Sequence, residues 1–363
     1  MSSTNLPHIG IAGAGLAGRT LAWRLLRAGC RVSLFDARQR DDLATASMTA
    51  AAMLSPLAEL AVSDEAVFAL GQRSMQLWPR WIAELEESGA GPVYFRQQGT
   101  LVVAHAPDQA SLEHFTRLLQ HKLEHSEQGA CRAQVHRLNA ASLAQYEPAL
   151  AGRFGGGLVL EGEGQLANDQ WMAALAVAID RLGVRWHEGQ AVDRVEKGRM
   201  VCAHETHAVD VAVDARGVGS KAQWPQLRGV RGEVLTVECP GVTLQRPVRL
   251  MHPRYQLYVA PRPGHRFVVG ATELESEDAG PVTLRSTLEL GSALHSLHPA
   301  FGEARVLRLA AALRPALDDH RPTALLRDGV WHINGLYRHG YLCAPALVDE
   351  LTRTLTGTCE RKE

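Results

Sequence analysis

The sequence predicts an α/β fold in which a parallel β-α-β unit is interleaved with a second unit of α+β type, built on an antiparallel or mixed sheet. Three observations lead to this prediction. The 363 residues exceed the roughly 100–200 residues of a typical domain, and 46% of them are hydrophobic, which suits a globular chain of two units. The chain opens with a β-α-β pattern. Residues 232–272 are rich in strand-forming residues.

The first elements follow from hydrophobic periodicity. Residues 9–12 form an apolar run, a segment of helical period follows until Gly29, and residues 32–35 form a second apolar run. This pattern is typical of a β-α-β unit. A helix is expected next over residues 64–87, with Ser63 as its N-cap.

Turn and capping signals place the later elements. Gly99 is expected to be the turn of a hairpin, and Asn168 to cap a helix. A Pro-Arg-Pro-Gly turn joins two strands of an antiparallel pair. The expected ranges are a hairpin of 93–95 and 101–104, helices over 107–125, 169–182 and 345–355, and strands over 184–187, 255–260, 266–270 and 330–334.

The charge balance narrows the class of partner. Lysine and arginine number 38 against 39 acidic residues, so the net charge is −1 and no basic excess exists for nucleic acid or anionic lipid. No secretion signal is recognised at the N-terminus, and no stretch reaches the roughly 18 apolar residues of a membrane span. We therefore expect a soluble, cytoplasmic protein with no nucleic-acid and no membrane partner. A homo-oligomer is left open.

Cysteine and histidine spacing predicts neither disulfides nor a metal site. No two of the six cysteines form a C-x-x-C pair, so they are expected to be reduced thiols. His121 and His125 lie four residues apart on an expected helix, but no third ligand is recognised nearby, and Gln120, Lys122 and Glu124 are typical of a solvated face.

A glycine motif, G-x-G-x-x-G at residues 13–18, directly follows the first strand and opens the first helix. The first glycine makes a tight turn, the second lets the backbone approach a pyrophosphate, and the third allows close packing of helix on strand. The helix N-terminus adds unpaired N–H groups that favour an anion. The motif predicts a Rossmann-type dinucleotide site whose residues are Gly13, Gly15, Leu16, Ala17 and Gly18.

The end of the second strand indicates which dinucleotide binds. Asp36 lies 18 residues beyond Gly18, where a carboxylate suits a free ribose 2′-hydroxyl and repels a 2′-phosphate. FAD or NAD is therefore favoured over NADP, although Arg38 weakens the argument slightly. Asp36, Ala37 and Arg38 are predicted cofactor residues. The motif does not separate FAD from NAD, because both use it.

Residues 45–54, a run of small residues ending in Met53 and Leu54, resemble the segment that follows the Rossmann unit in glycine oxidase, of the D-amino-acid oxidase type of FAD-dependent amine oxidoreductases. Similar blocks follow in order along nearly the whole chain. They are Val192, 214–217, 231–233, 258–262, 269–272, 313–315, 337–340 and 344–345.

The resemblance implies FAD as the cofactor. The small-residue segment would run along the flavin, and the segment after Tyr337 would bring a helix N-terminus to the pyrimidine end of the ring. The role of His339, which stands where asparagine is common, is left open. No histidine lies between Asp36 and His105, so we expect non-covalent FAD, with Cys343 close enough to check. The further cofactor residues implied are Ser47, Ala51, Ala52, Met53, Val192, Gly217, Arg338, His339, Gly340 and Tyr341.

The resemblance also places a substrate carboxylate on Arg314, with help from Tyr258. A guanidinium matches a carboxylate bidentately, and a phenol adds a third donor, so the two side chains can orient a small amino-acid or amine substrate. Arg338 is the second candidate, either at the substrate or at the flavin edge. These three residues are the predicted catalytic group.

The reaction implied is hydride transfer from the substrate α-carbon to flavin N5. The imine would be hydrolysed to a 2-oxo acid and ammonia, and O2 would reoxidise the flavin and give H2O2. Two alternatives stay open: an amino-acid dehydrogenase of the same fold that passes electrons to a quinone, and a flavoprotein that modifies a partner macromolecule. A nicotinamide-dependent dehydrogenase is the last alternative, and a yellow preparation would exclude it.

Some positions depart from the glycine-oxidase pattern. Glu273 stands where an apolar residue is usual, and Gln256 where a histidine occurs. A Glu273 that faces the substrate would repel a carboxylate and favour a second amino group. Alternatively it begins a solvated acidic run that continues with Glu275 and Glu277. Residues 218–220 and 318–325 also differ from the pattern.

The positions of these blocks predict interleaved units. A discontinuous FAD-binding domain is expected over residues 1–80, 145–225 and 305–363, and a substrate-binding domain over 81–144 and 226–304.

Overall fold

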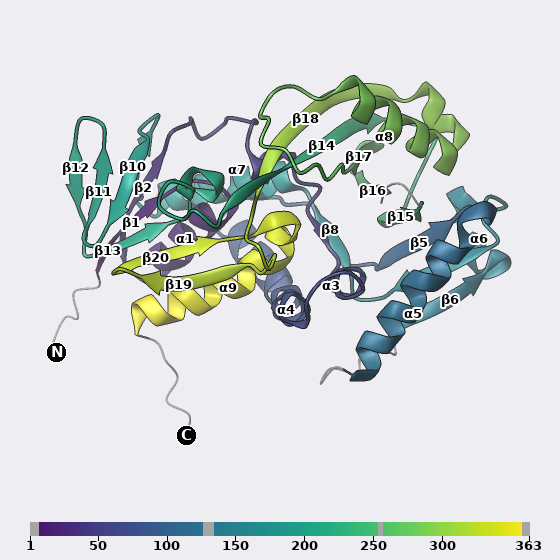
Figure 1. The fold of residues 1–363 in the computed structure, drawn as a ribbon, viewed down its shortest axis with the longest axis horizontal. Helices are drawn as coiled ribbons and strands as arrows, with labels where there is room; N and C mark the ends of the chain where they lie inside the picture. Colours follow the sequence, from purple (N-terminus) through teal and green to yellow (C-terminus); the bar gives the residue numbers. More distant parts are fainter. Residues whose placement is uncertain (1–6, 126–133, 253–256, 358–363) are drawn as a thin grey trace.

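The computed structural model describes residues 7–125, 134–252 and 257–357. Its centre is a six-stranded sheet in the order β19-β20-β13-β1-β2-β9 (Figure 1). All neighbours in it are parallel except β19 and β20. The strands are β1 (His8–Ala12), β2 (Arg31–Asp36), β9 (Arg185–Glu188), β13 (Val211–Asp214), β19 (Thr323–Arg327) and β20 (Val330–Asn334). The predicted parallel β-α-β unit is confirmed.

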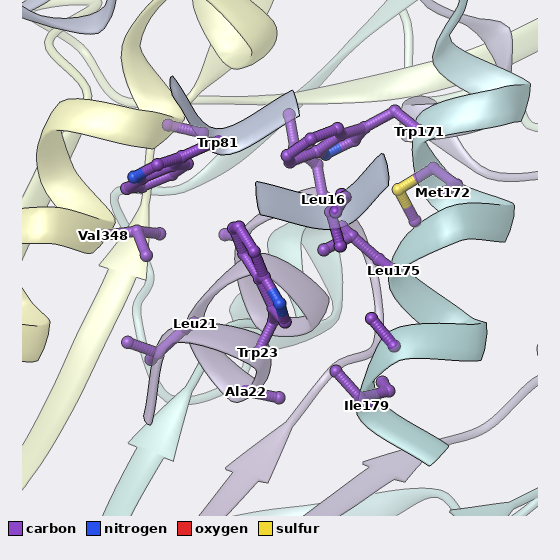
Figure 2. Close-up of a cluster of buried hydrophobic side chains, with 14 of the residues drawn as sticks. Leu16, Leu21, Ala22, Trp23, Trp81, Trp171, Met172, Leu175, Ile179 and Val348 are labelled. Carbon is purple, nitrogen blue, oxygen red and sulfur yellow. The ribbon is translucent and has the colours of Figure 1, made fainter. Parts of the chain in front are cut away.

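Four long helices cover one face of this sheet. Helix α1 packs against α7 and α9, and α4 packs against α9. The ring of Trp23 meets those of Trp81 and Trp171 edge to face, with centroids 5.8 and 6.1 Å away, at the centre of the core in Figure 2. Such aromatic pairs add roughly 0.5–1.5 kcal/mol each beyond the area they bury. The helices are α1 (Leu16–Arg27), α4 (Glu65–Glu87), α7 (Asn168–Arg181) and α9 (Gly340–Thr356).

A small antiparallel sheet covers the other face. Val192 and Met200 pack against Ala12 and Phe35 of the parallel sheet, whereas Ile11 and Leu34, one position earlier in their strands, point to the helices. The strands of this sheet are β10 (Val192–Glu196), β11 (Arg199–Cys202) and β12 (Thr206–Ala208).

The second large sheet has eight strands in the order β18-β14-β17-β16-β15-β5-β7-β6 and extends to the right of Figure 1. All neighbours are antiparallel except β15 and β5. This confirms the predicted second unit with a mixed sheet. The strands are β5 (Thr100–Ala104), β6 (Val135–Asn139), β7 (Gly156–Leu160), β14 (Arg228–Glu238), β15 (Val248–Met251), β16 (Leu257–Arg262), β17 (Arg266–Gly270) and β18 (Arg305–Ala316).

Helices lie on both faces of the eight-stranded sheet. Leu101 and Val103 of β5 belong to the core under α8, and Val102 and Ala104 to the core under α3 and α5, as the alternation of a strand requires. The remaining helices are α2 (Ala46–Thr49), α3 (Pro56–Leu60), α5 (Gln109–His125), α6 (Ala140–Tyr146) and α8 (Leu284–Leu297), with short 3-10 turns η1 (Ala106–Asp108), η3 (Pro148–Leu150), η4 (Gly217–Ser220), η5 (Pro299–Glu303) and η6 (Tyr337–His339).

The predicted hairpin around Gly99 is wrong. A third small sheet joins β3 (Met53–Leu54), β8 (Gly164–Leu166) and β4 (Phe95–Arg96), so the strand before Gly99 pairs with β8. The strand after it, β5, pairs with β7 and β15. Gly99 does turn the chain with a φ of 79°, but it directs the two strands into different sheets.

Helix ends differ from the prediction where side chains take other partners. Asp64, not Ser63, caps α4, and its side chain accepts a hydrogen bond from Ala66 N at 2.8 Å. Helix α7 already includes Asn168, whose amide donates to Ser47 O at 3.0 Å instead of capping. Helix α9 begins at Gly340 rather than near residue 345, with Pro345 inside it.

Two strands of the eight-stranded sheet lie within residue ranges that were predicted to belong to the FAD-binding domain. Strands β7 and β18 belong to the eight-stranded sheet, although residues 145–225 and 305–363 were assigned to the FAD-binding domain. The bounds themselves stay a prediction. In the described part of the chain, no helix combines the length and apolar character needed to cross a bilayer.

Candidate active site

A cavity of about 750 Å³ is lined by residues from both large sheets. Its size lies within the range of small-molecule and cofactor sites. With the exception of Gly18, every residue predicted to bind cofactor or substrate lines it. These residues are Gly13, Gly15, Leu16, Ala17, Asp36, Ala37, Arg38, Ser47, Ala51, Ala52, Met53, Val192, Gly217, Tyr258, Arg314, Arg338, His339, Gly340 and Tyr341.

The glycine loop between β1 and α1 has the geometry that its sequence predicts. Gly13 has a φ of 100° and lies against the Ala215 backbone, where no side chain would fit. A Cβ at Gly18 would collide with the carbonyl oxygen of Gly13, which explains why Gly18 packs behind the loop and does not line the cavity. A Cβ at Gly15 would meet no heavy atom within 4 Å, because this glycine faces open space.

Asp36 closes the loop from the end of β2. Its Oδ2 accepts a hydrogen bond from Ala14 N at 2.6 Å, and its Oδ1 accepts one from Arg38 N at 2.9 Å. The Arg38 guanidinium forms an ion pair with Asp42 at 2.7 Å. The charge of Arg38 is therefore matched by Asp42, which removes the weakness it introduced into the choice against a 2′-phosphate.

The small-residue segment is held in place by residues distant in sequence. Ser47 O accepts hydrogen bonds from the Tyr341 hydroxyl at 2.9 Å and from Asn168 at 3.0 Å. Arg262 donates to Ala51 O, and its Nη1 donates to Gln165 at 2.6 Å. Asn168 and Arg262 were not recognised as contributors from the sequence, because their role depends on contacts across the fold.

The N-terminus of α9 opens on the cavity after the turn η6. Gly340 and Tyr341 line the cavity, and no side chain caps this end of the 17-residue helix. Unpaired N–H groups and the positive end of the helix dipole therefore face the site. Pro345 leaves Tyr341 O without its usual helical donor, and the indole N–H of Trp78 donates to this oxygen at 3.1 Å.

A buried carboxylate that the sequence prediction missed, Glu59 of α3, lies at the wall of the cavity. Its Oε2 lies 3.1 Å from Arg338 Nε and 3.3 Å from His339 Nδ1, and its Oε1 lies 3.0 Å from Arg249 Nη2. Burial opposes ionisation, yet Arg338, His339 and Arg249 hold the pKa of this carboxyl well below its ordinary value. The only sequence signal was a single acid in an apolar segment.

Glu273 is a cavity residue and not only part of a solvated run. Its Oε1 accepts a hydrogen bond from the Tyr337 hydroxyl, and its Oε2 lies 3.3 Å from Arg338 Nη1. Glu275 and Glu277, in contrast, pair with Arg228 and Lys221 outside the cavity lining. Gln256 lies outside the described residues.

Arg314 and Tyr258 reach the cavity from β18 and β16. The Arg314 guanidinium lies over Gly232 of β14, where any Cβ would collide with it, and its Nη1 donates to Thr272 O at 3.0 Å. Among the described residues, no carboxylate lies within 4.0 Å of this guanidinium. Burial raises the pKa of Tyr258, against an opposing effect of Arg314, so its phenol keeps its proton at neutral pH and can donate.

The histidine pair His121 and His125 and the thiol of Cys343 are not among the residues that line the cavity. His121, Glu124 and His125 have potential ligand atoms within 4.8 Å of one another, so Glu124 supplies a third group that the histidine spacing did not predict. All three are exposed, and the absence of a metal stays a prediction. Cys343 is buried and is not among the residues that line the cavity, and non-covalent binding of FAD stays a prediction.

Residues 8–354 match the sequence model of the family described as FAD dependent oxidoreductase, DAO. The chain belongs to this family of FAD-dependent oxidoreductases. A relative from Rhizobium etli, provisionally named thiamine biosynthesis oxidoreductase ThiO, is 39% identical over 345 residues, which cover 95% of each chain. The glycine oxidase of Bacillus licheniformis is 25% identical over 97% of this chain and 94% of its own length.

Solved structures agree with the fold. The glycine oxidase of Geobacillus kaustophilus superposes with a TM-score of 0.84 at 23% identity and covers 99% of this chain and 96% of its own. The glycine oxidase of Bacillus cereus gives a TM-score of 0.83 at 21% identity over 98% and 96%. The α/β fold with interleaved sheets is therefore that of this family.

The cavity fits FAD, the cofactor of the family. The open side of Gly15 leaves room for a pyrophosphate, and the start of α1 carries no side-chain cap that would compete for its N–H groups. Asp36 stands beside this loop at the end of β2, where a ribose hydroxyl is bound in such folds. The N-terminus of α9 supplies a second anion-stabilising end in the same cavity.

Proposed function

We propose that this protein catalyses the oxidative deamination of a small amino acid or amine, with glycine as the first candidate. The observation that carries the proposal is the unpaired guanidinium of Arg314. Among the residues that the structure describes, five arginines line the cavity, and Arg38, Arg216, Arg249 and Arg338 each have a carboxylate partner. Arg314 is left, among the described residues, to bind an anionic group from outside.

The chain's own residues bind and orient the substrate in this proposal. Arg314 takes the carboxylate through its guanidinium fork, and the Tyr258 phenol donates a further hydrogen bond. With the carboxylate bound in this way, the amine and the α-carbon of the substrate face the rest of the cavity. When FAD is bound in the cavity, it would supply the acceptor for the substrate hydride, with O2 as the final oxidant and H2O2 as its product. The imine product is hydrolysed by water to a 2-oxo acid and ammonia.

We propose that the two large sheets bind different molecules. The parallel sheet and its loops hold FAD, without a covalent bond, through the glycine loop, Asp36, the small-residue segment and the start of α9. The eight-stranded sheet binds the substrate through Tyr258 and Arg314. The names of the relatives, glycine oxidase and thiamine biosynthesis oxidoreductase, support glycine as substrate and thiamine biosynthesis as the context.

Anaerobic reduction tests the proposal. Purified holoenzyme is mixed with glycine, sarcosine, D-amino acids, L-amino acids and diamines, and the loss of flavin absorbance is recorded. We expect glycine or sarcosine to reduce the flavin fastest. If no amine in the panel reduces it, the proposed function is wrong and modification of a partner macromolecule becomes the better hypothesis. Oxygen consumption with peroxide formation then separates an oxidase from a quinone-linked dehydrogenase.

A further inference from the structure

Arg338 lies between two carboxylates from different parts of the chain. Its Nε lies 3.1 Å from Glu59 of α3, and its Nη1 lies 3.3 Å from Glu273 in the loop after β17. Glu59 also pairs with Arg249 at 3.0 Å. All four charged side chains line the cavity. Their two positive and two negative charges balance, so this cluster presents no net positive charge to a substrate.

Both oxygens of Glu273 are engaged. One accepts the hydrogen bond from the Tyr337 hydroxyl, and the other faces Arg338. Burial opposes ionisation of this carboxyl, but Tyr337, Arg338 and, beyond ion-pair distance, Arg314 hold its pKa below the ordinary value, so it is ionised at neutral pH. A second ammonium group on the substrate would have to displace Arg338 from Glu273. The cluster therefore does not offer a free anion to a diamine or a basic amino acid.

The same cluster disfavours a second carboxylate. A substrate with two carboxylates could place one on Arg314, but the other would need Arg338, whose Nη1 side is held by Glu273. The second carboxylate would also meet the negative charge of Glu273 at close range, which is repulsive. Specificity against such substrates then comes from a repulsive group as well as from an attractive one.

We propose that Glu273 sets the substrate class of this pocket. By holding Arg338, it leaves Arg314 as the one guanidinium among the described residues that is available to a substrate, so the pocket takes amines with one carboxylate and rejects those with two. This inference rests on amine oxidation as the proposed function of the same cavity. Glu273 acts here as a positioning and specificity-determining residue. Arg338, in this arrangement, does not bind the substrate carboxylate.

Ligand binding without turnover gives the first test. Acetate and malonate carry one and two carboxylates and have no amine to oxidise. Calorimetric titration of wild-type holoenzyme is expected to give tighter binding of acetate than of malonate. In Glu273→Gln, the affinity for malonate relative to acetate is expected to rise at least tenfold, because Arg338 Nη1 becomes available while Glu59 still holds Arg338 Nε. An unchanged ratio would overturn the inference.

The matched control is Glu275→Gln, two residues further along the same loop. Glu275 is exposed and pairs with Arg228 outside the cavity, so the same loss of charge is expected to leave the malonate-to-acetate ratio at its wild-type value. An equal rise in both variants would assign the effect to the net charge of the loop and contradict a specific role of Glu273. Near-ultraviolet circular dichroism of both variants checks that the fold is retained.

Turnover gives the second test and separates this inference from the proposed function. The ratio of kcat/KM for iminodiacetate to kcat/KM for glycine is expected to rise at least tenfold in Glu273→Gln. If wild-type enzyme oxidises no amine, the proposed function fails, while the acetate and malonate titrations still decide the role of Glu273. If glycine is oxidised but neither ratio changes in Glu273→Gln, the inference alone fails.

Discussion

At the scale of single residues, Arg314 differs from the other described arginines of the cavity because no carboxylate of the described residues lies within 4.0 Å of its guanidinium. Gly232 leaves space for the guanidinium across the sheet, and Thr272 O fixes one of its nitrogens at 3.0 Å. The remaining N–H groups are left for a ligand. A planar guanidinium held in this way loses little freedom when it binds a carboxylate, which favours tight and oriented binding.

Replacement of this side chain tests its role. Arg314→Ala is expected to retain FAD and to lower kcat/KM for glycine about 30- to 1,000-fold, which corresponds to roughly 2–4 kcal/mol of transition-state binding. Steady-state kinetics and the flavin content of the purified variant are the measurements. Arg305→Ala, at the exposed start of the same strand, is the control and is expected to change kcat/KM little. An unchanged kcat/KM in Arg314→Ala would remove this residue from the site.

At the scale of elements, two glycines in the turn from β1 into α1 have different roles. Gly18 allows close packing of the helix on the strand, whereas Gly15 leaves room for the cofactor. Gly18 lies where the helix crosses the strand, against the Gly13 carbonyl. Gly15 lies at the start of the helix and faces open space in the cavity. The two positions look equivalent in the motif, but a methyl group at each would meet different surroundings.

Alanine at each position is therefore expected to have a different effect. Gly18→Ala should lower the free energy of unfolding of the FAD-free protein by roughly 1–3 kcal/mol, because the new Cβ collides with backbone. Gly15→Ala should leave that free energy within about 0.5 kcal/mol of wild type and weaken FAD binding instead. Urea unfolding and calorimetric titration with FAD measure the two quantities. Equal losses of stability in both variants would contradict this division.

At the scale of the whole molecule, buried charges lie where the parts of the fold meet. Glu163, directly before β8, is fully buried and accepts a hydrogen bond from Ala58 N of α3 at 2.8 Å. Its Oε2 has no hydrogen-bond partner among the described residues. Burial, only partly opposed by Arg249 of β15, raises the pKa of this carboxyl to about 7. The Glu163 carboxyl therefore keeps a proton, at pH values between 4.5 and about 7, that the unfolded chain would release.

Stability should depend on pH through this group. The ordinary pKa is 4.5, so the folded state keeps the proton between pH 4.5 and about 7 while the unfolded state loses it. The contribution is fully present below pH 4.5 and is lost as the pH rises through about 7. Between pH 5 and pH 8, the unfolding free energy measured in urea should therefore fall by roughly 2–3 kcal/mol because of Glu163.

A variant isolates this contribution from the other titrating groups. In Glu163→Gln, the unfolding free energy should fall less, or rise more, between pH 5 and pH 8 than it does in wild type. Burial also raises the pKa of Glu147 to about 7, but this residue is present in both proteins, so its contribution cancels when the two are compared. Glu161→Gln, an exposed carboxylate two residues earlier, is the control. The same pH dependence in wild type and Glu163→Gln would show that Glu163 is ionised in the folded protein at pH 5.

Much of the cofactor side of the cavity could be predicted from local sequence. The glycine loop and Asp36 lie within one β-α-β unit, where turn geometry, helix dipole and strand alternation act over a few residues. The hairpin predicted at Gly99 was wrong, because a turn signal does not indicate which strand will pair with the segments on either side of the turn. The helix start at Gly340 was not assigned because Pro345 is a usual signal for a helix start. Pro345 has no N–H to donate to Tyr341 O, and Trp78 from another helix donates to this oxygen instead.

The α/β class and the dinucleotide loop could be inferred from the order of residues alone, since both follow from short-range backbone geometry. FAD as the cofactor and Arg314 as the carboxylate-binding residue were implied by the resemblance to the D-amino-acid oxidase type. Which charges are paired became evident only in the folded chain. Glu59, Glu273 and Arg338 are far apart in sequence and meet in one cavity, whereas Arg314 stays without a carboxylate partner among the described residues. The physical reason is that electrostatic energy depends on distance in space and on burial, which the order of residues along the chain does not specify.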